Sequence, residues 1–149
     1  MAGWVVGSKA GILSRTCKPA KTFEELHIFQ EARHMAFEIW KITRTRPFAA
    51  DRVLVNQIRR AGLSIVSNIA EGFERGSRAE FGRFLKIAKG SCGEVRAQMQ
   101  VASDQGYISK QECAAFCLVA KRVSAGLSNL AHYLKESPDR TRQSSSDSA

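Results

Sequence analysis

Long hydrophobic runs and prolines are both scarce in this sequence, and each shortage narrows the class of protein. No apolar run approaches the roughly 18–20 residues that a membrane-spanning helix needs, so we expect no membrane partner. The first residues lack the basic start and the small-residue cleavage site of a secretory signal, and we therefore expect a cytoplasmic protein. With 3 prolines in 149 residues, long helices can run without interruption.

Sequence motifs of the common enzyme classes are also missing. There is no G-x-S-x-G elbow, and the glycine-containing segments match neither a Walker loop nor a dinucleotide-binding loop. The four cysteines include no C-x-x-C pair of the kind that zinc sites use. We interpret Cys17, Cys92, Cys113 and Cys117 as free thiols, the last three packed as small hydrophobic side chains. We therefore expect a protein that is not an enzyme and binds no cofactor or metal.

One polar helix face suggests a metal site. His27, Glu31, His34 and Glu38 are spaced by four, three and four residues, so they share one face of a helix. Glu31-x-x-His34 has the spacing of di-iron bundles, but such sites need two of these pairs and further carboxylates, and here there is one pair. We interpret the face as solvent-exposed and keep a metal-dependent enzyme as the weakest of three hypotheses.

Four amphipathic segments account for most of the chain. A capping box satisfies free backbone N–H groups where a helix starts. The predicted boxes are Thr22 with Glu25, Ser77 with Glu80, and Ser109 with Glu112, and Asp51 is the predicted cap of the remaining helix. The helices are predicted to end at Pro47, at Gly72–Gly76, at Gly106 and at Pro138.

Apolar residues recur at steps of three and four in each segment, which predicts one buried stripe per helix. For the last three helices the predicted core residues are Leu54, Ile58, Ala61, Ile65, Ile69, Phe81, Phe84, Ala88, Cys92, Val95, Met99, Ala102, Phe116, Val119, Ala120, Val123, Leu127, Leu130 and Leu134. The pattern predicts an all-α, up-down-up-down antiparallel four-helix bundle over residues 22–136. We expect residues 1–21 to be a poorly ordered lead and residues 137–149 to be a disordered polar tail.

Positive charge is concentrated in the middle of the chain. The sequence has 23 Lys and Arg against 14 Asp and Glu, a net charge of +9. Residues 41–90 alone hold eleven basic and four acidic residues. Because basic side chains displace counterions from nucleic acids, this segment is the predicted electrostatic binding surface. A basic face that does no more than solvate the protein is the alternative.

The predicted third helix carries the densest basic stripe. Arg78, Lys89 and Arg96 fall within a narrow wedge of the helix, and Arg83 and Lys86 widen it. No helix-turn-helix, zinc-finger or aromatic stacking motif is present, so any binding is expected to involve the nucleic-acid backbone and not the bases. The predicted phosphate contacts are Arg59, Arg60, Arg75, Arg78, Arg83, Lys86, Lys89 and Arg96.

A continuous polar stripe runs along the predicted second helix. Gln57, Arg60, Ser64, Asn68 and Glu71 follow at steps of three, four, four and three. Polar groups are costly to bury unless they are paired. The stripe is therefore either an interhelical network or wet face, or a contact between two copies of the chain.

Three segments together resemble a known family. QIRRAGLSIVSNIAEG at 57–72, IAKGSCGEV at 87–95 and GYI at 106–108 resemble the bacterial four-helix bundle proteins encoded by intervening sequences of large-subunit ribosomal RNA genes. The resemblance implies a cytosolic, non-enzymatic homopentamer. The residues that match the family pattern, which we interpret as motif or subunit-interface residues, are Gln57, Arg60, Ser64, Asn68, Glu71, Gly72, Ser77, Gly90, Ser91 and Glu94.

Individual motif residues suggest structural roles. Gly72 suits a left-handed turn at a helix end, Gly90 suits the close approach of another helix, and Glu94 suits pairing with the second helix. Gly62 departs from the family pattern, where a small aliphatic residue is expected, and costs about 1 kcal/mol of helix propensity.

The chain is more distantly similar to the accessory protein of diversity-generating retroelements, a basic bundle that forms a ring of five and binds nucleic acid and a reverse transcriptase. The leading hypothesis is therefore a homo-oligomeric accessory protein that binds RNA or DNA, and with it a nucleic-acid enzyme as a further partner. The alternative is a homo-oligomeric scaffold that binds a protein partner and has no nucleic-acid function.

Overall fold

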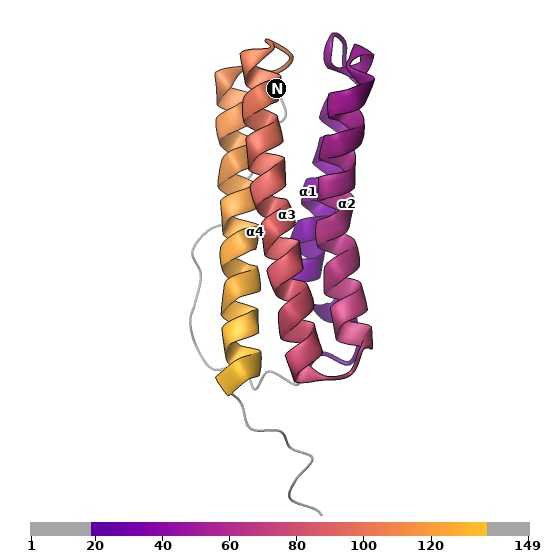
Figure 1. Cartoon of the computed structure of the whole chain (residues 1–149), viewed down its shortest axis with the longest axis vertical. Coiled ribbons are helices and arrows are strands. Elements are labelled where there is room, and N and C mark those ends of the chain that lie inside the picture. The colour runs from indigo at the N-terminus through magenta and orange to yellow at the C-terminus, as the bar shows by residue number, and fades with distance from the viewer. Residues whose placement is uncertain (1–18, 137–149) are drawn as a thin grey trace, which may run out of the picture.

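The computed structural model describes residues 19–136, which form four long helices in one bundle (Figure 1). The helices are α1 (His27–Ile42), α2 (Arg52–Glu74), α3 (Arg78–Asp104) and α4 (Lys110–Glu136), with two short 3-10 helices, η1 (Phe23–Glu25) and η2 (Phe48–Ala50). Successive helices run in opposite directions in Figure 1. No strand occurs within residues 19–136, and the prediction of an all-α four-helix bundle is confirmed. Most of the predicted lead and the whole predicted tail lie outside the described residues.

Three of the predicted helix starts have a capping hydrogen bond from the expected side chain. The Ser109 backbone N–H donates to Glu112 Oε2 at 2.7 Å, and the Glu112 N–H donates to Ser109 Oγ at 3.1 Å, which completes a capping box. Asp51 Oδ1 accepts from the Leu54 N–H at 2.9 Å at the start of α2. At the start of α3, Ser77 Oγ accepts from the Glu80 N–H at 3.3 Å. Side chains therefore fix where α2, α3 and α4 begin.

The prediction for the first helix start is wrong. The Thr22 side chain makes no capping hydrogen bond, and Glu25 Oε2 accepts from the Lys21 N–H at 2.8 Å instead. Residue Leu26 is extended, with φ −72° and ψ 122°, so it separates η1 from α1. The same helix ends at Ile42, before the predicted stop at Pro47, and is followed by η2.

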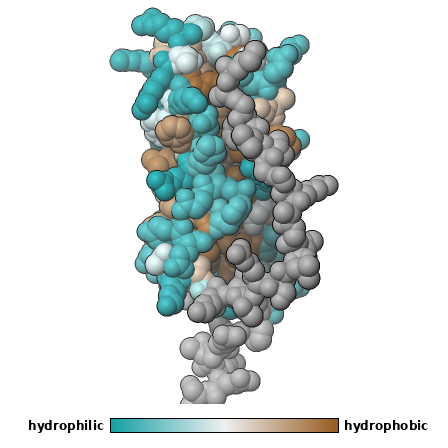
Figure 2. Space-filling view, turned by 180° about the vertical axis from the view of Figure 1, so that it is seen from behind, coloured by the Kyte–Doolittle hydropathy of each residue, from teal (hydrophilic) through white to brown (hydrophobic). Residues whose placement is uncertain are grey.

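The core follows the predicted stripes closely. Of the predicted core residues, those that are half-buried rather than buried are Leu54, Leu130 and Leu134. Each helix packs against two neighbours, with α3 between α2 and α4. The face in Figure 2 is mainly hydrophilic, with hydrophobic side chains showing between the polar ones. No helix within residues 19–136 is long and apolar enough to cross a membrane.

Several glycines have structural roles that differ from those predicted from the sequence. Gly72 lies inside α2, where an added Cβ would stand 2.6 Å from Phe84 Cβ, so α2 and α3 approach closely here. The left-handed turn belongs to Gly76, with φ 74°. Gly90 is exposed and an added Cβ would meet nothing within 4 Å among the described residues, so no helix of the same chain approaches it. The buried Gly62 has a packing reason, since its Cβ would stand 2.8 Å from Ile39 Cδ1.

The α1–α2 connection and the α3–α4 turn meet at one end of the bundle. The ring of Phe48 stacks on Tyr107 with centroids 5.4 Å apart. The Tyr107 hydroxyl donates to Asp51 Oδ2 at 3.1 Å, and this hydrogen bond raises the pKa of Tyr107. The α2–α3 turn lies at the other end (Figure 1). This second end holds the candidate site.

Candidate nucleic-acid interface

A groove separates the first half of α3 from the last turns of α4. Its volume is about 750 Å³. We call it the α3–α4 groove, and its lining residues are Arg78, Ala79, Gly82, Leu85, Lys86, Lys89, Leu127, Ser128, Ala131, His132, Leu134 and Lys135. Leucine and alanine side chains contribute apolar lining, and four basic residues join them. The groove is therefore amphipathic and cationic.

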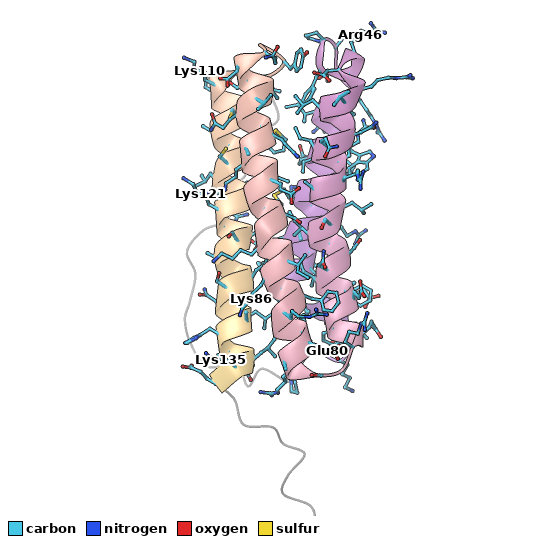
Figure 3. All side chains as sticks on the ribbon, in the orientation of Figure 1. Arg46, Glu80, Lys86, Lys110, Lys121 and Lys135 are labelled. Atoms are coloured by element: carbon cyan, nitrogen blue, oxygen red, sulfur yellow. The ribbon has the colours of Figure 1, made fainter. Side chains whose placement is uncertain are left out.

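No carboxylate belongs to the described lining of this groove. Lys86, Lys89 and Lys135 are exposed and form no salt bridge with any residue of 19–136. Figure 3 shows Lys86 on α3 and Lys135 on α4, toward the same end of the bundle. His132 pairs with Glu136 at 3.2 Å on the exposed surface. The groove thus keeps a positive potential that no lining acid cancels.

The antiparallel pairing of α3 with α4 brings this charge together. Arg78, Lys86 and Lys89 were predicted as phosphate contacts, whereas Lys135 and His132 were not. The last turns of an antiparallel fourth helix must lie beside the first turns of the third. The basic residues near the end of the predicted fourth helix, read with that topology, are the signal that could have identified them.

Two other predicted contacts lie on the α2 side of α3. The guanidinium groups of Arg75 and Arg83 lie over the Phe84 ring, 5.4 Å and 5.2 Å from its centroid. Arg75 also donates to Glu71 Oε1 at 2.8 Å and lies 3.9 Å from Glu80 Oε1. The bond to Glu71 raises the pKa of Arg75. Carboxylates therefore already compensate Arg75, which makes it a weaker phosphate contact.

The remaining predicted contacts lie elsewhere. Arg59 faces the end of α1, where its Nε donates to Thr43 Oγ1 at 2.9 Å. Arg96 is half-buried farther along α3, and its Nε is buried with no hydrogen-bond partner among the described residues. Arg60 is exposed on α2. The expectation that all eight basic residues form one surface is wrong, because the helices turn them toward different neighbours.

The polar stripe of α2 joins α3 over part of its length. Ser64 Oγ and Ser91 Oγ are 2.9 Å apart, and Asn68 Nδ2 donates to the Ser64 carbonyl at 2.8 Å and to its Oγ at 3.1 Å. These hydrogen bonds form the interhelical network that was one of the alternatives predicted for this stripe. Gln57 and Arg60 are exposed beside it.

For four of the residues that match the family pattern, the single chain shows either the burial or the contacts of the residue. Ser91 and Gly72 are buried between its own helices, so they cannot contact a second copy directly. Ser77 caps α3. Glu94 is exposed and forms no salt bridge with a residue of 19–136, contrary to the role predicted for it.

The polar face of α1 points toward α4. Glu31 Oε1 lies 3.3 Å from Arg122 Nε, and Glu31 Oε2 lies 3.8 Å from His27 Nδ1. The Glu31 and Glu38 side chains are 21% and 19% exposed, whereas the His27 side chain is 86% exposed and His34 is exposed too, so the prediction of a solvent-exposed face is confirmed for the two histidines and not for the two carboxylates. Within residues 19–136 no three His, Cys, Asp or Glu side chains are grouped to hold a metal ion.

The thiols lie in or near the core, as predicted for three of them. Cys92 and Cys113 are buried, and Cys117 is half-buried. Burial raises the pKa of the Cys92 thiol to about 12, against the opposing effect of the Arg96 charge. Burial, and then the neighbouring Cys117, raises the pKa of Cys113. Cys17 lies outside the described residues.

The comparisons with known proteins agree with the resemblance found in the sequence. A solved structure of a protein with unknown function from the S23 ribosomal protein family, from Bacteroides thetaiotaomicron VPI-5482, is 22% identical to this chain with a TM-score of 0.64. The match covers 70% of this chain and 97% of that one, and at this identity it shows a shared fold. No curated protein matches the chain. The family described as 23S rRNA-intervening sequence protein matches residues 24–129, and the chain belongs to that family.

Proposed function

We propose that the protein is a non-enzymatic accessory protein that binds the backbone of RNA or DNA along the α3–α4 groove. The observation that carries this proposal is the group of basic side chains that line the groove without a lining carboxylate. Each cation that replaces a condensed counterion on a nucleic acid contributes to binding at low salt. Residues already paired with acids, such as Arg75, contribute less.

The dimensions of the groove favour a chain of phosphates over a single ion. Arg78 and Lys89 are eleven residues apart on α3, which corresponds to about 16 Å along the helix axis. That length matches about five phosphate steps of one strand. No Phe, Tyr or Trp of residues 19–136 lines the groove, and His132 is its one aromatic ring there, so little base stacking is expected, and binding should tolerate many sequences.

The test is the salt dependence of binding. A fluorescently labelled single-stranded RNA is titrated with the wild-type protein and with the K86Q/K89Q/K135Q variant over a range of salt concentrations. We expect the variant to bind about 100-fold more weakly at low salt, and the slope of log affinity against log salt to fall by about 2. The same titration with a DNA duplex compares the two nucleic acids.

A matched control removes the same charge elsewhere. Arg33, Lys110 and Lys121 are exposed, lie outside the groove and form no salt bridge with residues 19–136. The R33Q/K110Q/K121Q variant should lose about threefold in affinity, because distant exposed charges are screened. Equal losses in the two variants, or binding that ignores salt, would contradict the groove as the interface.

A protein partner is the competing occupant, and the apolar lining of the groove favours it. Ala79, Ala131 and Leu134, the apolar lining residues that are exposed or half-buried, could accept the apolar face of an acidic amphipathic helix. Purification with and without nuclease separates the two: a single co-purifying protein that nuclease leaves in place supports the alternative. Loss of the co-purifying material on nuclease treatment supports nucleic-acid binding.

We further propose that the chain self-associates, as the pentamer implied by the resemblance. The support is an exposed apolar surface on α3, where Ile87 and Val101 are 45% and 46% exposed on one helix face that also carries the exposed Gly90. Light scattering at micromolar concentration should give the mass of five chains for the wild type and a lower mass for I87E/V101E. A wild type that is monomeric at that concentration contradicts the proposal.

A further inference from the structure

A second basic pocket lies at the opposite end of the bundle from the α3–α4 groove. It has a volume of about 540 Å³ and is formed where α1 ends and α2 begins. We call it the α1–α2 pocket, and its polar lining residues are Thr43, Arg44, Arg52, Asn56 and Arg59. Arg52, Asn56 and Arg59 are spaced by four and three residues, so they form one stripe of α2. Figure 3 shows that Arg46, on the adjoining connection, is at this end.

The three arginines of the pocket have no acidic partner among residues 19–136. None of Arg44, Arg52 and Arg59 forms a salt bridge with a carboxylate there. The neighbouring carboxylate, Asp51, does not line the pocket, and its oxygens accept hydrogen bonds from the Leu54 N–H and from Tyr107. Three positive charges therefore share one cavity whose described lining contains no carboxylate.

Arg59 is held in position by its own surroundings. Its Nε donates to Thr43 Oγ1 at 2.9 Å, and its guanidinium lies 5.4 Å from the centroid of the Trp40 ring. Thr43 is 1% exposed and its hydroxyl donates to the Ile39 carbonyl at 2.7 Å, which fixes the acceptor. The two terminal nitrogens of Arg59 make no hydrogen bond with residues 19–136. A fixed guanidinium with free terminal N–H groups is suited to bind two oxygens of one anion.

We infer that the α1–α2 pocket binds a compact phosphate ligand with two or more negative charges, a phosphate monoester or a pyrophosphate, through Arg44, Arg52 and Arg59. Three cations in one cavity favour a ligand with more than one negative charge over the single charge of an internal phosphodiester. The volume lies within the range of small-molecule sites. No aromatic residue of 19–136 lines the pocket, so no aromatic face is offered there to a base. Two sources supply this chemistry: a free small phosphate, or the phosphorylated 5′ end of a nucleic-acid strand.

The direct test is calorimetric titration with inorganic pyrophosphate at low salt. The R44Q/R52Q variant changes two exposed side chains that form no hydrogen bond or ion pair with residues 19–136, and it should bind at least about tenfold more weakly. R59K keeps the charge and loses the fork, and should also weaken binding. R33Q/K121Q, the control with equal charge loss, should bind within about threefold of the wild type. Absence of saturable binding to the wild type, or equal affinity of R44Q/R52Q and the control, would overturn the inference.

The two sources are separated with one oligonucleotide prepared with a 5′-phosphate and with a 5′-hydroxyl. A preference of about tenfold for the phosphorylated strand that R44Q/R52Q abolishes assigns the pocket to a strand end. Equal binding of both strands, with pyrophosphate still sensitive to R44Q/R52Q, assigns it to a free phosphate. The groove variant K86Q/K89Q/K135Q should keep its pyrophosphate affinity, so failure of the groove proposal and failure of this one give different results. Pyrophosphate binding that is lost in the groove variant and kept in R44Q/R52Q would overturn the inference.

Discussion

The two sides of α3 near the α2–α3 turn differ in whether their basic side chains are paired with acids and in whether a groove opens beside them. On the side of α2 the helices nearly touch, with Gly72 against Phe84. There the nearby Arg75 is bound to Glu71. On the side of α4 the helices also pack against each other, but the α3–α4 groove opens beside this contact, and its Lys86 and Lys89 have no acidic partner within residues 19–136.

The sequence has basic residues on both sides of α3, and the difference between them lies in the helix that packs against each side. A close helix pair excludes a ligand and lets side chains reach across to acids. A groove between two helices leaves room for a ligand, and the lysines of the α3–α4 groove have no acidic side chain of residues 19–136 within reach. Charge in a sequence therefore indicates a binding surface only where the fold leaves that charge both accessible and uncompensated.

The strongest test of the comparison changes one glycine on each side. Gly72→Ala places a methyl group against Phe84 and should destabilise the fold by about 1–3 kcal/mol. Gly82→Ala, in the groove, meets nothing within 4 Å and should stabilise α3 by about 0.5–1 kcal/mol. Urea denaturation measures both. Equal effects of the same sign would mean that the two sides are packed alike.

The pH dependence of stability at Cys92 shows whether water reaches the core around α3. Its pKa is raised from 9.0 to about 12, so the folded state holds a proton that the unfolded state releases. The contribution of Cys92 to stability is full below pH about 9 and is lost as pH rises from 9 to 12, at up to about 1.4 kcal/mol per pH unit. Denaturation curves of wild type and Cys92→Ala over this range should diverge in slope. Parallel curves would show that water reaches the thiol.

Mutation of the Ser64–Ser91 pair measures how much a hydrogen bond between α2 and α3 adds to the free energy of unfolding. Each of S64A and S91A should cost about 1 kcal/mol of the free energy of unfolding, and the double variant should cost less than the sum. Ser67 is exposed on the same helix and S67A should have almost no effect. Additive costs in the cycle would contradict a direct bond between the two hydroxyls.

The smallest effect is expected at Arg75. Arg75→Gln removes an exposed pair, and the midpoint of thermal unfolding should barely change. Its affinity for RNA should fall by less than about threefold, and less than that of Lys86→Gln in the groove. A larger loss at Arg75 would reverse the assignment of the two sides, because the acid-paired arginine would then be the better phosphate contact.

The sequence predicts most of the fold and part of the site, for reasons that individual residues make clear. Local signals work where one side chain acts on its own turn, as in the box formed by Ser109 and Glu112. They fail at Thr22, because the extended Leu26 interrupts the helix that the pattern predicts. Helix periodicity identifies which residues are buried, but it does not show where a groove opens between two neighbouring helices.

The parts of the site that sequence reasoning missed depend on distance in space. Lys135 joins Lys86 through the antiparallel packing of α3 and α4, across 49 positions of the chain. The place of Gly72 in close packing needs the position of Phe84. Each of these is set by tertiary contacts that a one-dimensional pattern does not contain.

Asp51 links local and long-range order in a single carboxylate. One oxygen holds the first turn of α2, and the other holds Tyr107, which follows α3. A change at this position would loosen two hairpins at once, although it lies in neither of the two proposed binding surfaces. The same carboxylate makes no ion pair with Arg44, Arg52 or Arg59, so the residue that joins the two hairpins leaves the guanidinium groups of the neighbouring pocket available to a ligand.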